Sequence, residues 1–132
     1  MAAAMQGEML PNIYRFKLGG FEVATIMDSH VIRPGLTPSF GGESHADEVK
    51  ALAAANRIEA DRYFHPFTPT VVNTGKELVL FDAGNGSLSA ENEQLKGRLP
   101  PGQLVARMAQ AGYKPEDVDV VVITHGHPDH IG

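Results

Sequence analysis

The stretch that decides the fold is THGHPDHIG, at residues 124–132. Three of the six histidines in the sequence fall within six residues here, with an aspartate between the second and the third. Neutral imidazole and carboxylate oxygen are ligands that suit a divalent ion such as zinc. A solvated surface loop or a purification tag is the plain alternative, but a tag is an unbroken histidine run, whereas Gly, Pro and Asp interrupt this one. The motif therefore predicts a metal site.

The spacing of the ligand-type residues leaves room for two metal ions. Side chains two residues apart on an extended segment point to the same side, so His125 and His127 can bind one ion together. Asp129 and His130 are adjacent and must point differently, which suits a second ion alongside. Two cations about 3.5–4 Å apart can share a bridging water, lower its pKa and polarise a substrate oxygen. The chemistry that this pattern indicates is hydrolysis.

The residues before the motif predict a strand, a helix and a second strand. Residues 119–124 form the β-branched run DVVVIT, of the kind that is buried on both faces of a sheet. A helix is predicted from about Gln103 to Ala111, with Gly112 just beyond its end and Pro115 after it. The histidine motif is therefore expected at the carboxyl end of a buried strand.

Two β-hairpins are predicted further upstream. Residues 12–27 alternate apolar and polar side chains around a two-glycine turn, and residues 70–81 form two short apolar runs around a Gly-Lys turn. The second hairpin ends in DAGNG at residues 82–86, which leaves Asp82 at a strand end. Taken alone, Asp82 is an ordinary turn aspartate. The histidine motif downstream favours a functional role instead.

The segment between the hairpins predicts less regular structure. Residues 28–43 contain several glycines and prolines and are expected to form a long loop. Ser44 is the expected N-cap of a helix that runs to about Arg57. The aromatic cluster at residues 63–67 is interpreted as core or hairpin packing in preference to a pocket wall. The polar residues 87–98 predict no element.

Composition excludes several classes of partner. The net charge is −5, with 11 basic and 16 acidic residues, and no basic stripe that would neutralise nucleic-acid phosphates is present. No cysteine is present, so a metal must be held by His and Asp. The sequence has no transmembrane stretch and no signal-peptide pattern, and a cytoplasmic protein is expected. The histidines without ligand spacing are His30, His45 and His65, which are interpreted as surface or capping residues, with a pocket-facing position as the alternative for His30 or His65.

The pattern His-x-His-x-Asp-His at residues 125–130 resembles the signature of the metallo-β-lactamase superfamily. That family also carries an upstream strand-end aspartate followed by a small residue and glycine, which Asp82-Ala83-Gly84 matches. The segments TVVNTG at residues 70–75 and GYKPED at residues 112–117 extend the likeness, which is strongest toward the lactonase and methyl-parathion-hydrolase-like branch. The resemblance implies an α/β fold, namely the N-terminal half of an αββα sandwich with a mixed sheet and flanking helices.

The resemblance also implies roles for the motif residues. His125 and His127 would bind the first of two divalent metal ions, expected to be zinc, and Asp129 and His130 the second. Asp82 would orient a ligand histidine or the motif loop. Asp129 would in addition hold the bridging hydroxide or move its proton. The implied activity is cleavage of a lactone, ester, amide or phosphotriester bond in a small-molecule substrate.

The family's remaining ligands come from the second half of its sandwich, which is absent from this sequence. Residues 1–132 are therefore expected to form a single, incomplete domain, a fragment of a longer hydrolase. The other accounts are a natural truncated product and a chain that pairs with a second chain, for example as a homodimer through the uncovered sheet. The alternative to an enzyme is a non-catalytic metal-binding half-domain. A redox or nucleic-acid-processing member of the family is a third, remote reading.

Overall fold

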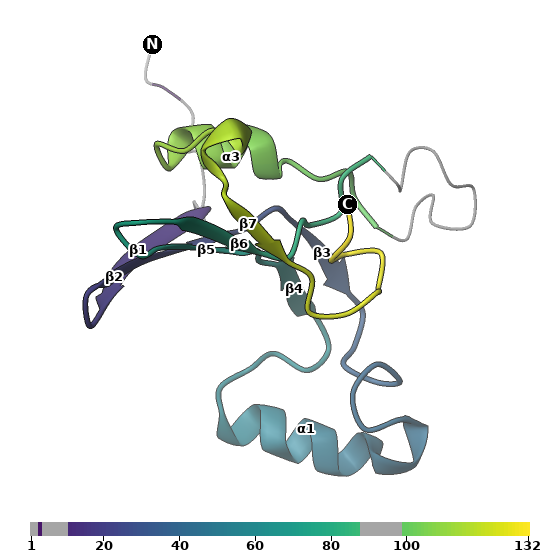
Figure 1. Cartoon of the computed structure of the whole chain (residues 1–132). Helices are drawn as coiled ribbons and strands as arrows, with labels where there is room; N and C mark the ends of the chain where they lie inside the picture. Colours follow the sequence, from purple (N-terminus) through teal and green to yellow (C-terminus); the bar gives the residue numbers. More distant parts are fainter. Residues whose placement is uncertain (1–2, 4–10, 88–98) are drawn as a thin grey trace. The chain divides into compact units, whose positions relative to one another are not determined.

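A computed structural model describes residue 3 and residues 11–87 and 99–132 of the chain (Figure 1). The chain divides into two compact units, one made of Met1–Ser29 with Phe67–Gly132 and the other of His30–Pro66. Residues 88–98, part of the segment to which the sequence assigns no element, lie outside the described residues.

The first unit is built on a five-stranded mixed sheet. Its strands, in their order across the sheet, are β1 (Ile13–Leu18), β2 (Phe21–Ile26), β5 (Thr70–Asn73), β6 (Leu78–Phe81) and β7 (Val120–Val122). The first four strands pair antiparallel, and β7 pairs parallel to β6. Both predicted hairpins, β1–β2 and β5–β6, are confirmed.

One face of this sheet packs against helix α3 (Leu104–Gln110), as Figure 1 shows. The pairs Ile13↔Ile26 and Val71↔Leu80 lie on this face, because residues directly opposite each other on neighbouring strands share a face. Burying each aliphatic side chain of this kind stabilises the fold by about 1.5–3 kcal/mol. The buried cluster consists of Ile26, Val71, Leu78, Leu80, Leu104, Met108 and Ala111.

Helix α3 ends where the sequence predicts. Gly112 has a φ of 87°, a left-handed conformation that glycine adopts without the steric cost of a Cβ. Its N–H donates to the Ala109 carbonyl at 3.0 Å, and the Tyr113 N–H donates to the Met108 carbonyl at 2.9 Å. This is the Schellman pattern, which satisfies two carbonyls at the helix end. The short 3-10 helix η2 (Pro115–Asp117) then leads into β7.

Strand β7 corrects one expectation. The β-branched run at residues 119–124 was expected to be buried on both faces, yet Val120, Val121 and Val122 are 38%, 52% and 37% exposed. Within the described part of the chain, β7 is the last strand of the sheet and has a neighbour only in β6. A strand is buried on both faces only when further layers cover it.

The second unit contains strand β4 (Tyr63–Phe67), paired with β3 (Ser29–Arg33), and the helices η1 (Glu43–His45) and α1 (Ala46–Ala55). The prediction of a loop over residues 28–43 is wrong at β3, because its partner strand lies about thirty residues away and no local turn signals the pairing. Ser44 as N-cap is also wrong. It lies inside η1, and His45 occupies the N-cap of α1 without a side-chain cap bond.

None of the helices in the described part of the chain is long and apolar enough to cross a bilayer.

Candidate metal centre

The histidine motif forms a loop at the carboxyl end of β7, as the sequence predicts. A second loop, which follows β6, holds it in place through backbone hydrogen bonds. The Ala83 N–H donates to the His130 carbonyl at 2.8 Å, and the Gly132 N–H donates to the Gly84 carbonyl at 2.9 Å. Within the motif, the His130 N–H donates to the His127 carbonyl at 3.0 Å and closes a turn. The two loops thus form one hydrogen-bonded unit.

Asp82 lies between these loops and binds both ends of the motif. One carboxylate oxygen accepts the Thr124 N–H at 2.8 Å, and the other lies 2.8 Å from Nδ1 of His130. The side chain is 15% exposed. Burial raises the pKa of the Asp82 carboxyl, but the hydrogen bonds from Thr124 and His130 outweigh that effect and hold the pKa below its ordinary value. Asp82 is therefore an acceptor-only carboxylate at neutral pH.

The hydrogen bonds around Asp82 assign the protons of two motif histidines. A carboxylate only accepts, so Nδ1 of His130 carries a proton in its contact with Asp82. The Thr124 hydroxyl lies 3.0 Å from both oxygens of Asp82 and donates there, so Nδ1 of His125, 3.1 Å from the same hydroxyl, must donate to it. In the neutral ring, Nε2 of His125 then carries the lone pair and accepts from Nδ1 of His127.

The ring nitrogens on the far side from Asp82 and Thr124 face other polar atoms of the motif, in two pairs. Nε2 of His125 lies 2.9 Å from Nδ1 of His127, and Nε2 of His130 lies 3.1 Å from a carboxylate oxygen of Asp129. The rings of His125 and His130 lie 3.9 Å apart between centroids, so the two pairs are neighbours. The structure thus brings together all five residues that the sequence singles out, including Asp82.

The donor types and their pairing fit divalent metal ions, with two protein donors for each ion. Imidazole nitrogen and carboxylate oxygen are both ligands of zinc, and catalytic zinc typically has three protein ligands. Within the described residues, no group of three or more His, Asp or Glu side chains is arranged to hold one ion. The site as described is therefore a partial ligand set.

The other histidines lie outside this centre. His65 accepts a hydrogen bond at Nδ1 from the Arg33 side chain at 3.0 Å, and His45 lies 3.4 Å from Glu48 on helix α1. The His30 ring packs 4.8 Å from the Phe64 ring. The aromatic cluster at residues 63–67 packs in the second unit with Phe40, whose ring meets that of Tyr63 edge-on at 5.6 Å.

The sequence did not predict a role for two buried polar residues of the first unit. Asp28 and Asn85 are 0% and 1% exposed; Asn85 belongs to the loop that carries Asp82, and its N–H donates to Asp28. Asp28 lies two residues after the end of β2 and directly before β3, whereas Asp82 directly follows β6. No local pattern marks either residue, because the backbone groups that bind Asp28 include those of Asn85, Gln103 and Leu104, which are far away in the sequence.

Comparison with known proteins agrees with this geometry. A sequence profile of the metallo-beta-lactamase superfamily matches residues 68–132, which contain both Asp82 and the histidine motif. Residues 68–132 are therefore a metallo-β-lactamase-like region of the chain. The mouse (Mus musculus) protein "Metallo-beta-lactamase domain-containing protein 1" is 41% identical over 58 residues, which is 38% of this chain and 22% of the mouse protein.

Solved structures of metallo-β-lactamase proteins share the fold. AidC, described as a dizinc quorum-quenching lactonase, aligns with 90% of this chain at 24% identity and a TM-score of 0.70. The hydrolase AbOPH of the beta lactamase superfamily aligns with 93% at 22% identity and a TM-score of 0.68. A probable metal-dependent hydrolase from Staphylococcus aureus aligns with 87% at 22% identity and a TM-score of 0.62.

The expected α/β fold with a mixed sheet is thereby confirmed for the metallo-β-lactamase part of the chain. The chain spans 37%, 39% and 41% of the length of these three structures, and 22% of the mouse protein.

Proposed function

We propose that this chain carries the metal-binding motif of a metal-dependent hydrolase that acts on a small molecule. The observation that carries the proposal is the pairing of ligand atoms at the end of β7, where Nε2 of His125 meets Nδ1 of His127 and Nε2 of His130 meets Asp129. Packing does not account for it, because His125 and His127 are exposed. Imidazole nitrogens and a carboxylate oxygen that converge in this way are the donor types that a bound zinc ion takes.

The proposal assigns two divalent ions, most simply zinc, to the two pairs. His125 and His127 would hold one ion, and Asp129 and His130 the other. Bound there, the ions would supply a Lewis acid and a water of lowered pKa. Asp82 fixes the ring of His130 so that its Nε2 faces Asp129. Asp129, half-buried beside His130, is the carboxylate placed to accept or deliver a proton.

The substrate class that we favour is a lactone, ester, amide or phosphotriester. The likeness to a quorum-quenching lactonase and to the hydrolase AbOPH supports this class, and the negative net charge of the chain disfavours a nucleic-acid substrate.

A second candidate is a metal-binding half-domain without turnover. It is favoured by the ligand count, because each pair offers two protein donors and no set of three is found among the described residues. With fewer donors, both the affinity for the ion and the activation of water should fall.

Metal titration tests the site directly. We expect the 132-residue chain to bind Zn²⁺ by calorimetry, and His127→Ala to weaken the binding at least tenfold because one pair loses a donor. His45→Ala is the matched control, since His45 is an exposed histidine outside the motif. Equal Zn²⁺ affinity in wild type and His127→Ala would contradict the metal site.

Turnover then separates the two candidates. Hydrolysis of an activated ester or a γ-lactone that chelator abolishes, that added Zn²⁺ restores and that His127→Ala lacks would support the enzyme. Zn²⁺ binding that His127→Ala weakens and His45→Ala does not, together with no turnover, would support the half-domain. Turnover that persists without any bound metal would contradict both.

A further inference from the structure

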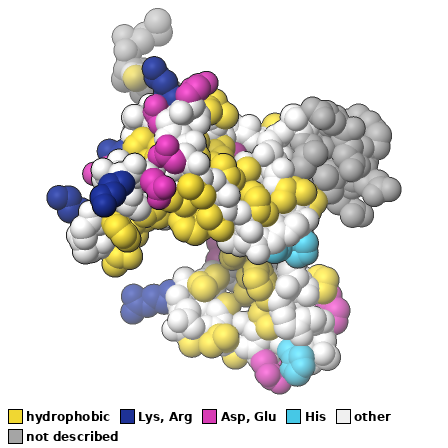
Figure 2. Space-filling view, in the orientation of Figure 1, with side chains coloured by type: hydrophobic (Ala, Val, Ile, Leu, Met, Phe, Trp, Pro, Cys, Tyr) yellow, Lys and Arg dark blue, Asp and Glu magenta, His cyan; other side chains and the backbone are white. Residues whose placement is uncertain are grey.

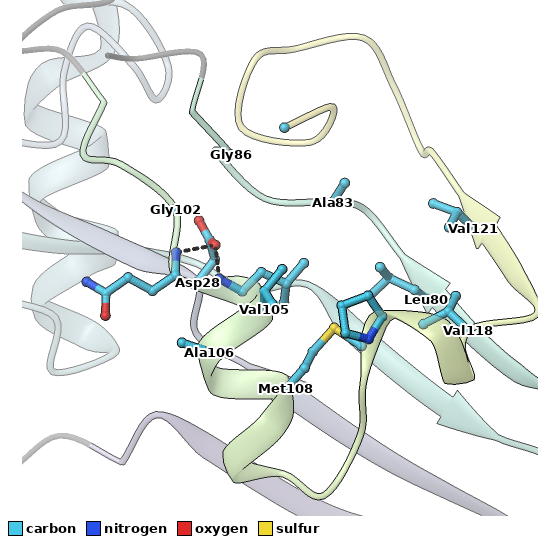
Figure 3. A pocket seen from close by; sticks show the side chains of 14 residues that line it. Asp28, Leu80, Ala83, Gly86, Gly102, Val105, Ala106, Met108, Val118 and Val121 are labelled. Atoms are coloured by element: carbon cyan, nitrogen blue, oxygen red, sulfur yellow. Dashed lines mark hydrogen bonds between the residues drawn. The ribbon is translucent and has the colours of Figure 1, made fainter. Parts of the chain in front are cut away.

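The first unit contains a buried carboxylate that the proposed chemistry does not use. Asp28 is 0% exposed, and its two oxygens accept four hydrogen bonds. One oxygen accepts the backbone N–H groups of Gln103 and Leu104 at 2.9 and 2.8 Å (Figure 3). The other accepts the Asn85 N–H and the Ser29 hydroxyl, both at 3.0 Å. Asp28 thus joins the start of helix α3 to the loop that follows β6.

The backbone is closely fitted around this carboxylate. A Cβ added at Gly84 would lie 2.6 Å from Cγ of Asp28, and one added at Gly102 would lie 2.8 Å from an oxygen of Asp28. Real Cβ atoms do not approach other atoms so closely, so both glycines let the main chain pass beside the carboxylate. The position of the loop at residues 84–86 is therefore set by contact with Asp28 as well as by hydrogen bonds.

The same loop holds the histidine motif from its other side. Asn85, which donates to Asp28, directly follows Gly84, whose carbonyl accepts the Gly132 N–H, and Ala83 donates to the His130 carbonyl. The Asn85 side chain strengthens the link by donating to the Ser29 hydroxyl at 2.8 Å and to the Pro100 carbonyl at 2.9 Å. Asp28 and the histidine motif thus both form hydrogen bonds to the short segment Ala83–Asn85.

From this chain of contacts we infer that Asp28 is a positioning residue for the histidine loop. It fixes the segment Ala83–Asn85, and that segment fixes His130 and the end of the motif. The inference rests on the proposed function, because the role that it gives to Asp28 is to hold the metal-binding atoms in place. That Asp28 fixes the position of the loop follows from the hydrogen bonds, whether or not a metal binds.

The informative substitution is Asp28→Asn. The amide has nearly the same size but only one acceptor oxygen, so its NH₂ group must face either the N–H groups of Gln103 and Leu104 or that of Asn85. A donor facing a buried donor leaves both unsatisfied. The control is Val71→Ala, which removes volume from the core on the far side of β6, away from the loop.

Amide hydrogen exchange measured by NMR distinguishes positioning from general stabilisation. At denaturant concentrations that equalise global stability, we expect the amides of Ala83, Thr124 and Gly132 to exchange at least tenfold faster in Asp28→Asn than in Val71→Ala. The amides within β5 and β6 should match between the two variants. Equal exchange at Ala83, Thr124 and Gly132 in both variants would overturn the inference.

Should Asp28→Asn fail to fold, Ser29→Ala gives the same comparison. It removes a donor to Asp28 and an acceptor for the Asn85 side chain, so the same three amides should lose protection to a smaller degree. Unchanged protection in Ser29→Ala would also count against the inference.

Binding of Co²⁺, followed by its visible absorption, completes the test. We expect Asp28→Asn to bind Co²⁺ about tenfold more weakly than Val71→Ala, as changes behind metal ligands commonly do. If wild type takes up no Co²⁺, the proposed function fails, and the exchange data alone decide whether Asp28 positions the loop. If wild type binds Co²⁺ and both variants bind it equally well, the positioning role is overturned while the proposed function stands.

Discussion

At the scale of single residues, the centre depends on a hydroxyl as much as on its histidines. The Thr124 side chain lies within 3.1 Å of both oxygens of Asp82 and of Nδ1 of His125. By donating to Asp82 and accepting from His125, it directs the lone pair of His125 toward His127. The Thr124 hydroxyl thereby determines which nitrogen of His125 is protonated. It also helps to hold Asp82, which determines the same for Nδ1 of His130.

We expect Thr124→Val to bind Zn²⁺ about tenfold more weakly than wild type, in the range typical of groups that orient metal ligands. Valine has the shape of threonine but cannot donate to Asp82 or accept from His125. The Thr124 N–H bond to Asp82 remains in the variant. Thr124→Ser is the matched control, because serine keeps the hydroxyl, and calorimetric titration makes the comparison. If valine and serine at this position give the same affinity, the hydroxyl does not orient the ligands.

The sequence predicts the residue types of the site better than their atomic roles. His125, His127, Asp129 and His130 stand in one short motif, so spacing alone groups them. Which nitrogen of the His125 and His130 rings donates toward the sheet depends on Asp82, which lies 48 residues before His130. Asp28 was missed because its hydrogen-bond donors lie up to 76 residues away. No local pattern reports contacts of that range.

At the scale of elements, the sequence predicts those strands and helices whose formation depends on residues close together in the chain. The β1–β2 and β5–β6 hairpins and helix α3 carry their turn and end residues within the element, and all three were found. Strand β3 has no such signal, since its partner β4 follows only after helix α1. The exposure of β7 depends on which other elements cover the strand, and the apolar sequence of β7 itself carries no information about them.

Helix α3 is fastened to the sheet by polar bonds as well as by its apolar face. The Tyr113 hydroxyl donates to Glu22 on β2 at 2.9 Å, and the Arg15 guanidinium lies 5.5 Å from the Tyr113 ring. Arg15 also donates to the Ala111 carbonyl at the helix end, and Arg107 donates to the Met27 carbonyl. Burial of Tyr113, and then its bond to Glu22, raise the pKa of its hydroxyl above the ordinary value.

We expect Tyr113→Phe to lower the free energy of unfolding by about 1 kcal/mol at pH 8, because one partly buried hydrogen bond is lost. A raised folded-state pKa means that this contribution is fully present below the ordinary tyrosine pKa of about 10 and is lost as pH rises through the folded-state value. The difference between wild type and Tyr113→Phe should therefore shrink by pH 11 in denaturant titrations. Tyr14→Phe, at a 66% exposed tyrosine, is the control and should show no such pH-dependent difference. A difference that is constant from pH 8 to pH 11 would contradict the role given to Tyr113.

At the scale of the whole chain, the face of the sheet opposite α3 is largely apolar, and it is exposed mainly toward its two edges, β1 and β7. Cross-strand pairing places Tyr14, Phe16 and Leu18 of β1 on the same face as Phe21 and Val23 of β2. The pairs Val23↔Val72, Val72↔Val79 and Val79↔Val120 carry this face across to β7. Figure 2 shows hydrophobic side chains gathered on the part of the molecule that contains the sheet. The exposed members of this face are Tyr14, Phe16, Leu18, Phe21, Phe81, Val120 and Val122.

We propose that this apolar face is an association surface. We expect two copies of the chain to associate through it, since a second copy supplies the same apolar side chains and a stable interface needs about 800 Å² from each partner. Sedimentation velocity over rising concentrations, with and without Zn²⁺, should then show a monomer–dimer equilibrium.

Leu18→Lys tests the surface, because Leu18 is 65% exposed and its replacement leaves the core intact. A charge that must be buried on association should weaken the dimer at least tenfold, or about 1.4 kcal/mol. Leu52→Lys on helix α1 is the matched control, since Leu52 is 68% exposed and belongs to the second unit. A purely monomeric wild type at every concentration would contradict the homodimer. Equal weakening by both lysines would show that the chain associates without using this face, because only one of the two lysines lies on it.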